Sequence, residues 1–314
     1  MPHLEVKSVI ATLAVLIGTE FGPGCEAAQA AAQRRPRAAT EARTGSFTDT
    51  LTPAWRAFYA GNLDRASELA GAALRVNAAD TGARLVMVRV AMERGDMEEA
   101  YNQLLRARRH APDSPDVLYY LGIVSADLAR SAFDALYKVA PDSARVHQLM
   151  AESFEAQDKG EEAIAEYEAA LRVDPHLLDA LLGLGKLKRI RLACDEAIPL
   201  YERAEAIRAT FDGAFGLGAC FAVQQDQEQA IARYRQALAH DQHAAVAWEG
   251  LGTALTRAGR PAEGIAALQR AIALEPGLGE AYYSLGLAYR KAGDEERANG
   301  AFEKARELQV GQRR

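Results

Sequence analysis

The sequence predicts an all-α protein built as a solenoid of repeated helix pairs. Three observations favour this fold class: short motifs ending in alanine recur along most of the chain, their interval is nearly constant, and the apolar residues between them keep the spacing of one helix face. The 314 residues are 49% hydrophobic and 25% charged, a composition typical of folded globular proteins. A single helix pair buries little apolar surface, so we expect successive pairs to stack.

The recurring motif combines a turn residue, acidic residues and an alanine. It reads GNLDRA at 61–66, GDMEEA at 95–100, KGEEA at 159–163 and GDEERA at 293–298. Acidic residues are favourable in the first turn of a helix, beside the positive end of its dipole. The closing alanines Ala66 and Ala100 are 34 residues apart, as are Ala163 and Ala197. The motif therefore marks the start of a second helix, helix B, in each repeat.

The first helix of each repeat, helix A, carries a large residue, a Leu-Gly pair and another large residue at i, i+3, i+4 and i+7, which lie on one face. The repeat from Ala245 has Trp248, Leu251-Gly252 and Leu255, and the last has Tyr282, Leu285-Gly286 and Tyr289, followed by Ala298, Phe302 and Ala305. These residues and spacings resemble the tetratricopeptide repeat (TPR).

The resemblance implies a right-handed superhelical solenoid of about eight helix-turn-helix TPR units, with the A helices on its concave side. The repeats are expected over residues 47–314. Their predicted starts are near residues 47, 81, 115, 144, 178, 211, 245 and 279.

Two repeats depart from the pattern. In the first, we expect Thr52 to cap a short helix A that begins at Pro53. The third is shortened by about five residues, its turn has no glycine, and Ser131 with Asp134 resembles a capping box. We therefore expect its helix B to begin near Ser131 and to run only to Ala140. Its apolar face would consist of Phe133, Leu136, Tyr137 and Val139.

The first 46 residues have a different composition. Residues 9–18 are apolar but too short to span a bilayer as an ordinary helix, and Ala28-Gln29-Ala30 matches a cleavage motif. Residues 1–30 are thus expected to be a signal peptide or an apolar N-terminal segment, with lipidation at Cys25 or an uncleaved start as alternatives. Residues 31–46 predict a flexible basic linker. We expect an exported, periplasmic or envelope-associated bacterial protein, with the cytoplasm as the alternative.

Several classes of function are disfavoured. The net charge of −6 does not favour nucleic-acid binding. Cys25, Cys194 and Cys220 form no disulfide framework, and His240 with His243 lacks further metal ligands. Phosphate-binding, dinucleotide-binding and nucleophile-elbow motifs are absent from the sequence. We therefore expect no enzyme activity, metal or cofactor. Membrane association is expected only through an N-terminal segment that is uncleaved or lipidated at Cys25.

The sequence predicts a non-enzymatic scaffold or adaptor that holds a segment of a partner protein in the concave groove. A membrane-associated envelope assembly or maturation factor is the alternative. Large apolar residues that face solvent indicate an interaction surface. The alternative is that these residues pack against the next helix A. The candidate groove residues, from groove-facing positions and the charges beside them, are Tyr119, Ile123, Lys186, Arg189, Phe215, Tyr283, Leu287 and Arg290.

Overall fold

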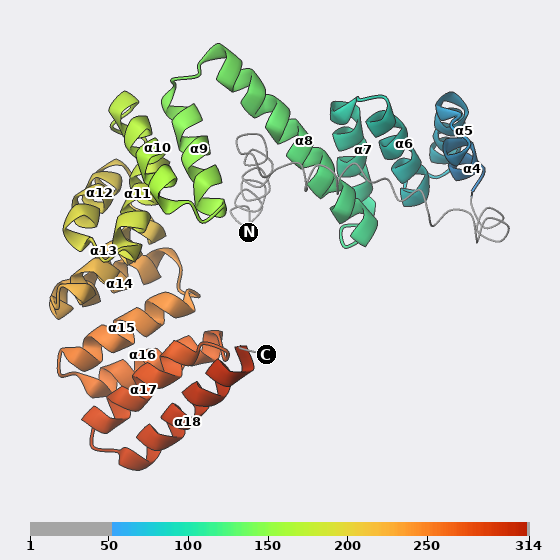
Figure 1. Ribbon diagram of the computed structural model, residues 1–314. Coiled ribbons are helices and arrows are strands. Elements are labelled where there is room, and N and C mark those ends of the chain that lie inside the picture. Colours follow the sequence, from blue (N-terminus) through green and yellow to red (C-terminus); the bar gives the residue numbers. More distant parts are fainter. Residues whose placement is uncertain (1–51, 313–314) are drawn as a thin grey trace. The chain divides into compact units, whose positions relative to one another are not determined.

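The computed structural model describes residues 52–312, and within this range every element is an α-helix (Figure 1). The predicted signal segment, the basic linker and the start of the first repeat near residue 47 lie outside the described residues. Among the described helices, none is both long enough and apolar enough to cross a membrane.

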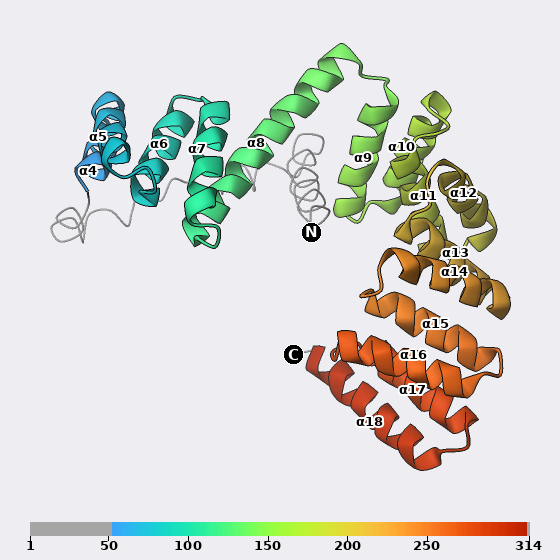
Figure 2. The ribbon, with the colours of Figure 1, turned by 180° about the vertical axis from the view of Figure 1, so that it is seen from behind.

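The contacts divide the helices into two compact parts, which we describe separately. Among the described residues, the N-terminal part contains 52–142 together with 152–159, and the C-terminal part contains 143–151 together with 160–312. In both parts helix pairs follow one another along the chain, except that the N-terminal part ends in one long single helix over residues 115–139 (Figures 1 and 2). The predicted all-α fold of stacked pairs is confirmed.

The first helix of the N-terminal part confirms the departure predicted for the first repeat. The hydroxyl of Thr52 caps it by accepting a hydrogen bond from the Trp55 amide at 3.4 Å, and Pro53 takes the first helical position, where no amide hydrogen is needed. The helices of this part are α4 (Pro53–Tyr59), α5 (Leu63–Val76), α6 (Thr81–Glu93), α7 (Met97–His110) and α8 (Pro115–Val139).

The prediction of a separate helix B near Ser131 is wrong. Helix α8 continues without a break for 25 residues, and Ser131 and Asp134 are exposed residues on it. The sequence has no glycine, proline or asparagine between Ile123 and Ala140, so nothing in this stretch favours a turn over the helix.

The end of α8 agrees with the prediction, because Ala140 is its C-cap. The apolar face predicted for this stretch is only partly covered. Phe133 and Leu136 are half-buried, whereas Tyr137 is 46% and Val139 85% exposed.

The C-terminal part alternates A and B helices. Helix α9 (Ala144–Ala156) contributes residues to both parts. The A helices α9, α11, α13, α15 and α17 begin at the residues from which the repeats were counted. The remaining helices are α10 (Gly160–Val173), α11 (Leu178–Ile190), α12 (Cys194–Ile207), α13 (Phe211–Val223), α14 (Gln227–His240), α15 (Ala245–Arg257), α16 (Pro261–Leu274), α17 (Gly279–Lys291) and α18 (Glu295–Gln312).

The A helices of the C-terminal part lie closer to one another than its B helices do. Helix α11 contacts α13, α13 contacts α15, and α15 contacts α17, whereas the described B helices make no comparable contacts with the next helix B. A stack of helix pairs whose helices are closer together on one side curves toward that side. The A helices therefore form the inner side. We call the surface formed by α11, α13, α15 and α17 the A-helix face.

Small residues allow the two helices of a repeat to approach each other. Gly264 opens helix B of the seventh repeat, and a Cβ there would lie 2.8 Å from the carbonyl oxygen of Gly252. The backbones of α15 and α16 are therefore too close for two alanines. In the other repeats that carry the motif, the closing alanine is fully buried: Ala66, Ala100, Ala163, Ala197, Ala230 and Ala298.

An aromatic residue of helix B fills the space between successive repeats. Tyr201 lies against Gly185 of its own repeat and Gly216 of the next. A Cβ at Gly250 would lie 2.5 Å from Cζ of Tyr234, so a larger residue there would force the packed ring to move. The next ring repeats the arrangement, with Tyr234 between Gly218 and Gly250.

Candidate functional site

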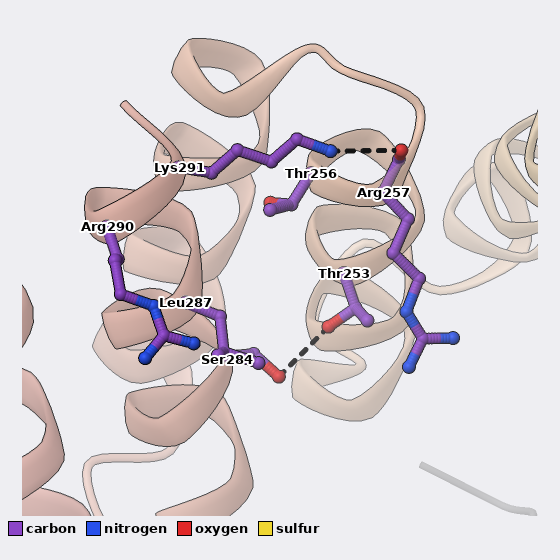
Figure 3. A pocket seen from close by; sticks show the side chains of 7 residues that line it. All are labelled: Thr253, Thr256, Arg257, Ser284, Leu287, Arg290 and Lys291. Carbon is purple, nitrogen blue, oxygen red and sulfur yellow. Dashed lines mark hydrogen bonds between the residues drawn. The ribbon is translucent and has the colours of Figure 1, made fainter. Parts of the chain in front are cut away.

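A cavity of about 290 Å³ lies on the A-helix face between α15 and α17 (Figure 3). Side chains spaced three or four residues apart share one side of a helix, and this spacing gathers the lining residues. Helix α15 contributes Thr253, Thr256 and Arg257, and α17 contributes Ser284, Leu287, Arg290 and Lys291. The cavity thus combines three hydroxyl groups, one apolar side chain and three cations.

Hydrogen bonds to Glu249 hold two of the three hydroxyl groups of the cavity. Thr253 Oγ1 and Ser284 Oγ donate to Oε1 of Glu249 at 2.8 and 2.7 Å, and the two hydroxyl oxygens are 3.0 Å apart. Hydrogen bonds to an ionised group are stronger than those between neutral groups. Glu249 therefore links α15 to α17 and fixes the positions of both hydroxyls.

The three cations of the cavity have no carboxylate partner among the described residues. Lys291 Nζ donates to the carbonyl oxygen of Arg257 at 3.2 Å, and the Arg290 guanidinium lies 5.6 Å from the centre of the Phe302 ring. In Figure 3, Arg257 extends from α15 and Arg290 from α17, with Thr253 between them. These contacts orient Lys291 and Arg290 without neutralising them.

Three of the predicted groove residues come together on α17. Leu287 and Arg290 line the cavity. The Tyr283 side chain is 54% exposed, and its ring centre is 5.5 Å from that of Phe302. Helix α17 therefore presents an aromatic, an aliphatic and a cationic side chain next to a cavity.

The aromatic residue predicted on α13 lies in a different environment. Phe215 is half-buried and stacks on Phe211, with ring centres 5.6 Å apart and an angle of 11° between the planes. It also contacts the buried Tyr234, ring centre to ring centre, at 5.8 Å. Phe215 therefore has the contacts of a packing residue, the alternative role considered from the sequence.

Arg189 of α11 is also held by its neighbours, whereas Lys186 on the same helix is exposed. The Arg189 guanidinium lies 5.7 Å from the centre of the Phe215 ring and is hydrogen-bonded to Tyr201. Burial raises the pKa of Tyr201 to about 12, although Arg189 acts in the opposite direction. Tyr201 is therefore neutral at physiological pH, and its hydroxyl oxygen accepts from Arg189.

The two remaining candidates, Tyr119 and Ile123, lie on α8 in the N-terminal part and are 63% and 39% exposed. Tyr119 makes an edge contact with Tyr120, whose ring in turn faces the guanidinium of Arg89 at 5.7 Å. Arg89 lies 5.1 Å from the Phe58 ring as well. The N-terminal part thus has an aromatic cluster of its own.

The sequence prediction missed five residues of the cavity: Thr253, Thr256, Arg257, Ser284 and Lys291. It considered the groove-facing positions 5 and 9 of the A helices and charged residues beside them, such as Arg290 at position 12. Arg257 and Lys291 occupy position 13 of successive A helices. Cations repeated at this position, 34 residues apart, are the signal that would have located the cavity.

The described residues contain no group of three or more His, Cys, Asp or Glu side chains that could hold a metal ion. Cys194 and Cys220 are free thiols buried in a cluster with Tyr201 and Leu217. Cys25, the predicted lipidation site, lies outside the described residues.

Two known proteins are similar to part of this chain. The general transcriptional corepressors trfA of Dictyostelium discoideum and ssn6 of Schizosaccharomyces pombe are each 34% identical to it, over 112 and 113 residues. These segments are 35% of this chain but only 8% and 10% of the two relatives. This chain therefore covers a small fraction of the length of these relatives.

Two solved structures are similar over about half of the chain. A crystal structure of MamA is 26% identical, with a TM-score of 0.47, and covers 52% of this chain and 96% of its own. YrrB, described as a TPR protein with an unusual peptide-binding site, is 22% identical, with a TM-score of 0.49. The match covers 57% of this chain and 93% of YrrB.

Sequence models of one repeat family match most of the described residues. One model described as the tetratricopeptide repeat matches residues 57–121, and a second matches 125–176, 149–213, 221–278 and 251–309. The matches of the second model alone cover more than half of the chain. The chain therefore belongs to the tetratricopeptide repeat family.

Proposed function

We propose that this protein is a non-enzymatic scaffold that holds a segment of a partner protein along the A-helix face of its C-terminal part. The observation that carries the proposal is the exposed Tyr283 beside a cavity lined by Leu287. Large apolar side chains in contact with solvent indicate an interaction surface, and concave sites bury more of a ligand than flat ones do.

The stacking of the helices supports the same surface. Because each helix A contacts the next one, the A-helix face is continuous across repeats, as required for an extended or helical segment. Tyr283 is the best anchor on this face, since Phe215 contacts Phe211 and Tyr234. We expect Tyr283→Ala to weaken binding by about 1 kcal/mol or more with little loss of stability, and Phe215→Ala mainly to lower stability.

The experiment is a quantitative pull-down from a lysate of the native host with three forms of the full chain. They are the wild type, the double variant Tyr283→Ala/Leu287→Ala, and the control Ile207→Ala. Ile207 is a large apolar residue of helix B in the fifth repeat and is 43% exposed. All three chains should have the same helical content by circular dichroism.

Proteins retained by the wild type and the control, but lost from the double variant, are the expected partners. Isothermal titration with each purified partner then gives the change in affinity. Partners retained equally by all three chains would place the binding surface elsewhere and contradict the proposal.

Export remains a separate proposal, because it depends on residues 1–30 outside the described range. N-terminal sequencing of the protein from its native host decides it. A mature chain that starts just after Ala30 supports cleavage and export, and one that starts at a lipid-modified Cys25 supports the membrane-associated alternative. An intact Met1 contradicts both cleavage after Ala30 and lipidation at Cys25, and leaves membrane association through the uncleaved segment as the alternative.

A further inference from the structure

We propose that α8 pairs antiparallel with α8 of a second copy of this chain, and that Gly122 of each copy packs against Phe133 of the other. This surface belongs to the N-terminal part, whereas the A-helix face belongs to the C-terminal part. The pairing supplies the third repeat with the helix contact that is missing within its own chain.

Helix α8 has apolar residues on two opposite faces. One face packs on α7 and includes the buried Val117 and Val124. The other face is formed by apolar residues that recur every three or four positions and therefore lie on the same side of the helix. We call this second face the α8 stripe, and it consists of Leu118, Tyr119, Gly122, Ala126, Ala129, Phe133, Leu136 and Tyr137.

The large side chains of the α8 stripe contact solvent near both of its ends. Leu118 and Tyr119 are 48% and 63% exposed, and Tyr137 is 46% exposed. Exposed apolar side chains grouped in this way indicate a binding surface. The middle of the stripe contains Ala126 and Ala129, whose small side chains would allow a second helix to approach to about 8–10 Å between axes.

The eighth repeat contains the contact that the third repeat lacks. There, the ring of Phe302 on helix B lies against Gly286 on helix A. The third repeat has both groups, because Gly122 has nothing within 4 Å of an added Cβ and Phe133 has the position of Phe302 in the helix B pattern. On one continuous helix these two residues are 11 positions apart, or about 16 Å. They cannot meet within one chain.

A second copy brings the two groups together by symmetry. Gly122 and Phe133 both lie on the α8 stripe, so a twofold axis midway between them places each glycine against the phenylalanine of the other copy. The same axis places Tyr119 at the level of Leu136 of the second copy. One surface thus forms both sides of the interface, as a twofold dimer requires. No other occupant is specified by the stripe itself in this way.

The charges at the ends of α8 favour the antiparallel orientation. Asp116 lies in the first turn and Lys138 in the last turn. Antiparallel pairing brings Asp116 of one copy close to the level of Lys138 of the other, whereas parallel pairing in register would align like charges. The two helix dipoles also run in opposite directions in the antiparallel pair.

The first test is sedimentation equilibrium of the full chain. We expect the wild type to change from monomer to dimer as its concentration rises through the range of about 1–100 µM. Phe133→Asp/Leu136→Asp places two charges in the α8 stripe and should keep the chain monomeric. Val76→Asp is the control and should still dimerise, because Val76 is 92% exposed on α5 of the same part. Circular dichroism checks that helical content is unchanged.

A second variant tests the glycine without removing any apolar side chain. In the separate chain a Cβ at position 122 meets no neighbour, so Gly122→Ala should not lower the stability of a dilute sample in which the chains are apart. In the dimer the same Cβ would meet the ring of Phe133. The dissociation constant of the dimer should therefore rise by about tenfold.

Photocrosslinking tests the register. A photoreactive phenylalanine derivative in place of Tyr119 should give a species of twice the mass, linked to residues near Leu136. These two positions are 17 residues apart on one helix, or about 25 Å, so this link cannot form within one chain. A parallel pair would instead link position 119 to its own equivalent.

The proposal is wrong if the wild type stays monomeric, if the double aspartate variant still dimerises, or if position 119 links to a different region of the second copy. A link to residues 1–30 at the mass of one chain would show that the N-terminal segment covers the stripe, and a link to another protein in the native host would show a different partner. Either result also contradicts the proposal. The proposed scaffold function is tested on the A-helix face and does not depend on these outcomes.

Discussion

The third and eighth repeats contain the same Leu-Gly pair but fold differently around it. In the eighth, Gly286 of α17 lies against Phe302 of α18, where an added Cβ would lie 2.5 Å from the ring. In the third, Gly122 of α8 is exposed, and nothing lies within 4 Å of an added Cβ. The Leu-Gly pair therefore marks helix A but does not ensure that helix B packs on it.

The two repeats fold differently because only the eighth has a turn between helix A and helix B. Gly293 joins α17 to α18 with φ of 84°, a left-handed conformation that glycine adopts without steric cost. Asp294 follows and accepts a hydrogen bond from the Arg297 amide at 3.0 Å, which satisfies one of the free amides at the start of α18.

The third repeat still contains the pattern of a helix B. Ala129 and Phe133 have the same spacing as Ala298 and Phe302 of the eighth repeat. Gly286 precedes Ala298 by 12 residues, but Gly122 precedes Ala129 by only 7. The missing residues are those that would form the turn, so the helix B pattern continues the same helix instead of folding back.

The largest expected effect is the difference in stability between alanine variants of two tyrosines. Tyr234 is 5% exposed and packs on glycines of two repeats, whereas Tyr137 at the end of α8 is 46% exposed. We expect Tyr234→Ala to lower the free energy of unfolding by about 3–5 kcal/mol and Tyr137→Ala by less than about 1 kcal/mol. Urea unfolding followed by circular dichroism measures both. Equal losses would mean that the end of α8 is packed as tightly as a regular repeat.

The next comparison uses the two matched glycines. Gly286→Ala should destabilise by about 1–3 kcal/mol, because the Phe302 ring must move. Gly122→Ala should stabilise by up to about 1 kcal/mol, since alanine is the better helix former and its Cβ meets no neighbour. A loss of stability in Gly122→Ala would contradict the exposed position of this glycine. Thermal melts of the two variants show whether each substitution raises or lowers the stability.

The smallest effect concerns the turn itself. Gly293→Ala places a side chain in the left-handed region and should cost about 1–2 kcal/mol. Because the strain is local, hydrogen exchange should increase mainly in α17 and α18 and hardly at all in α8. Unchanged exchange near residue 293 would show that the turn does not hold these helices in place.

Most of the fold was predictable because its signals repeat. The period and the Leu-Gly pairs located the starts of the helices, including those at Thr81, Ala144 and Phe211. The prediction at Ser131 was wrong because the capping-box pattern is local and is equally compatible with the interior of a helix. An exposed Ser within a stretch without Gly, Pro or Asn does not stop a helix.

The candidate site was predictable only in part, since sequence position does not determine exposure. Phe215 and Tyr283 occupy the same position of their A helices, yet Phe215 is half-buried against Phe211 and Tyr283 is 54% exposed. The difference comes from neighbours on the same and adjacent helices. The cations of the cavity likewise depend on which charges lack a partner, and this requires the packed structure.

Site-specific photocrosslinking tests the central claim, which is that the A-helix face and not the outer face contacts the partner. A photoreactive phenylalanine derivative replaces Tyr283 in one full chain and the exposed Ala273 of α16 in another, and both are irradiated in the native host. We predict a discrete protein adduct from position 283 that is absent from position 273. The same adduct from position 273, with none from 283, would contradict the claim.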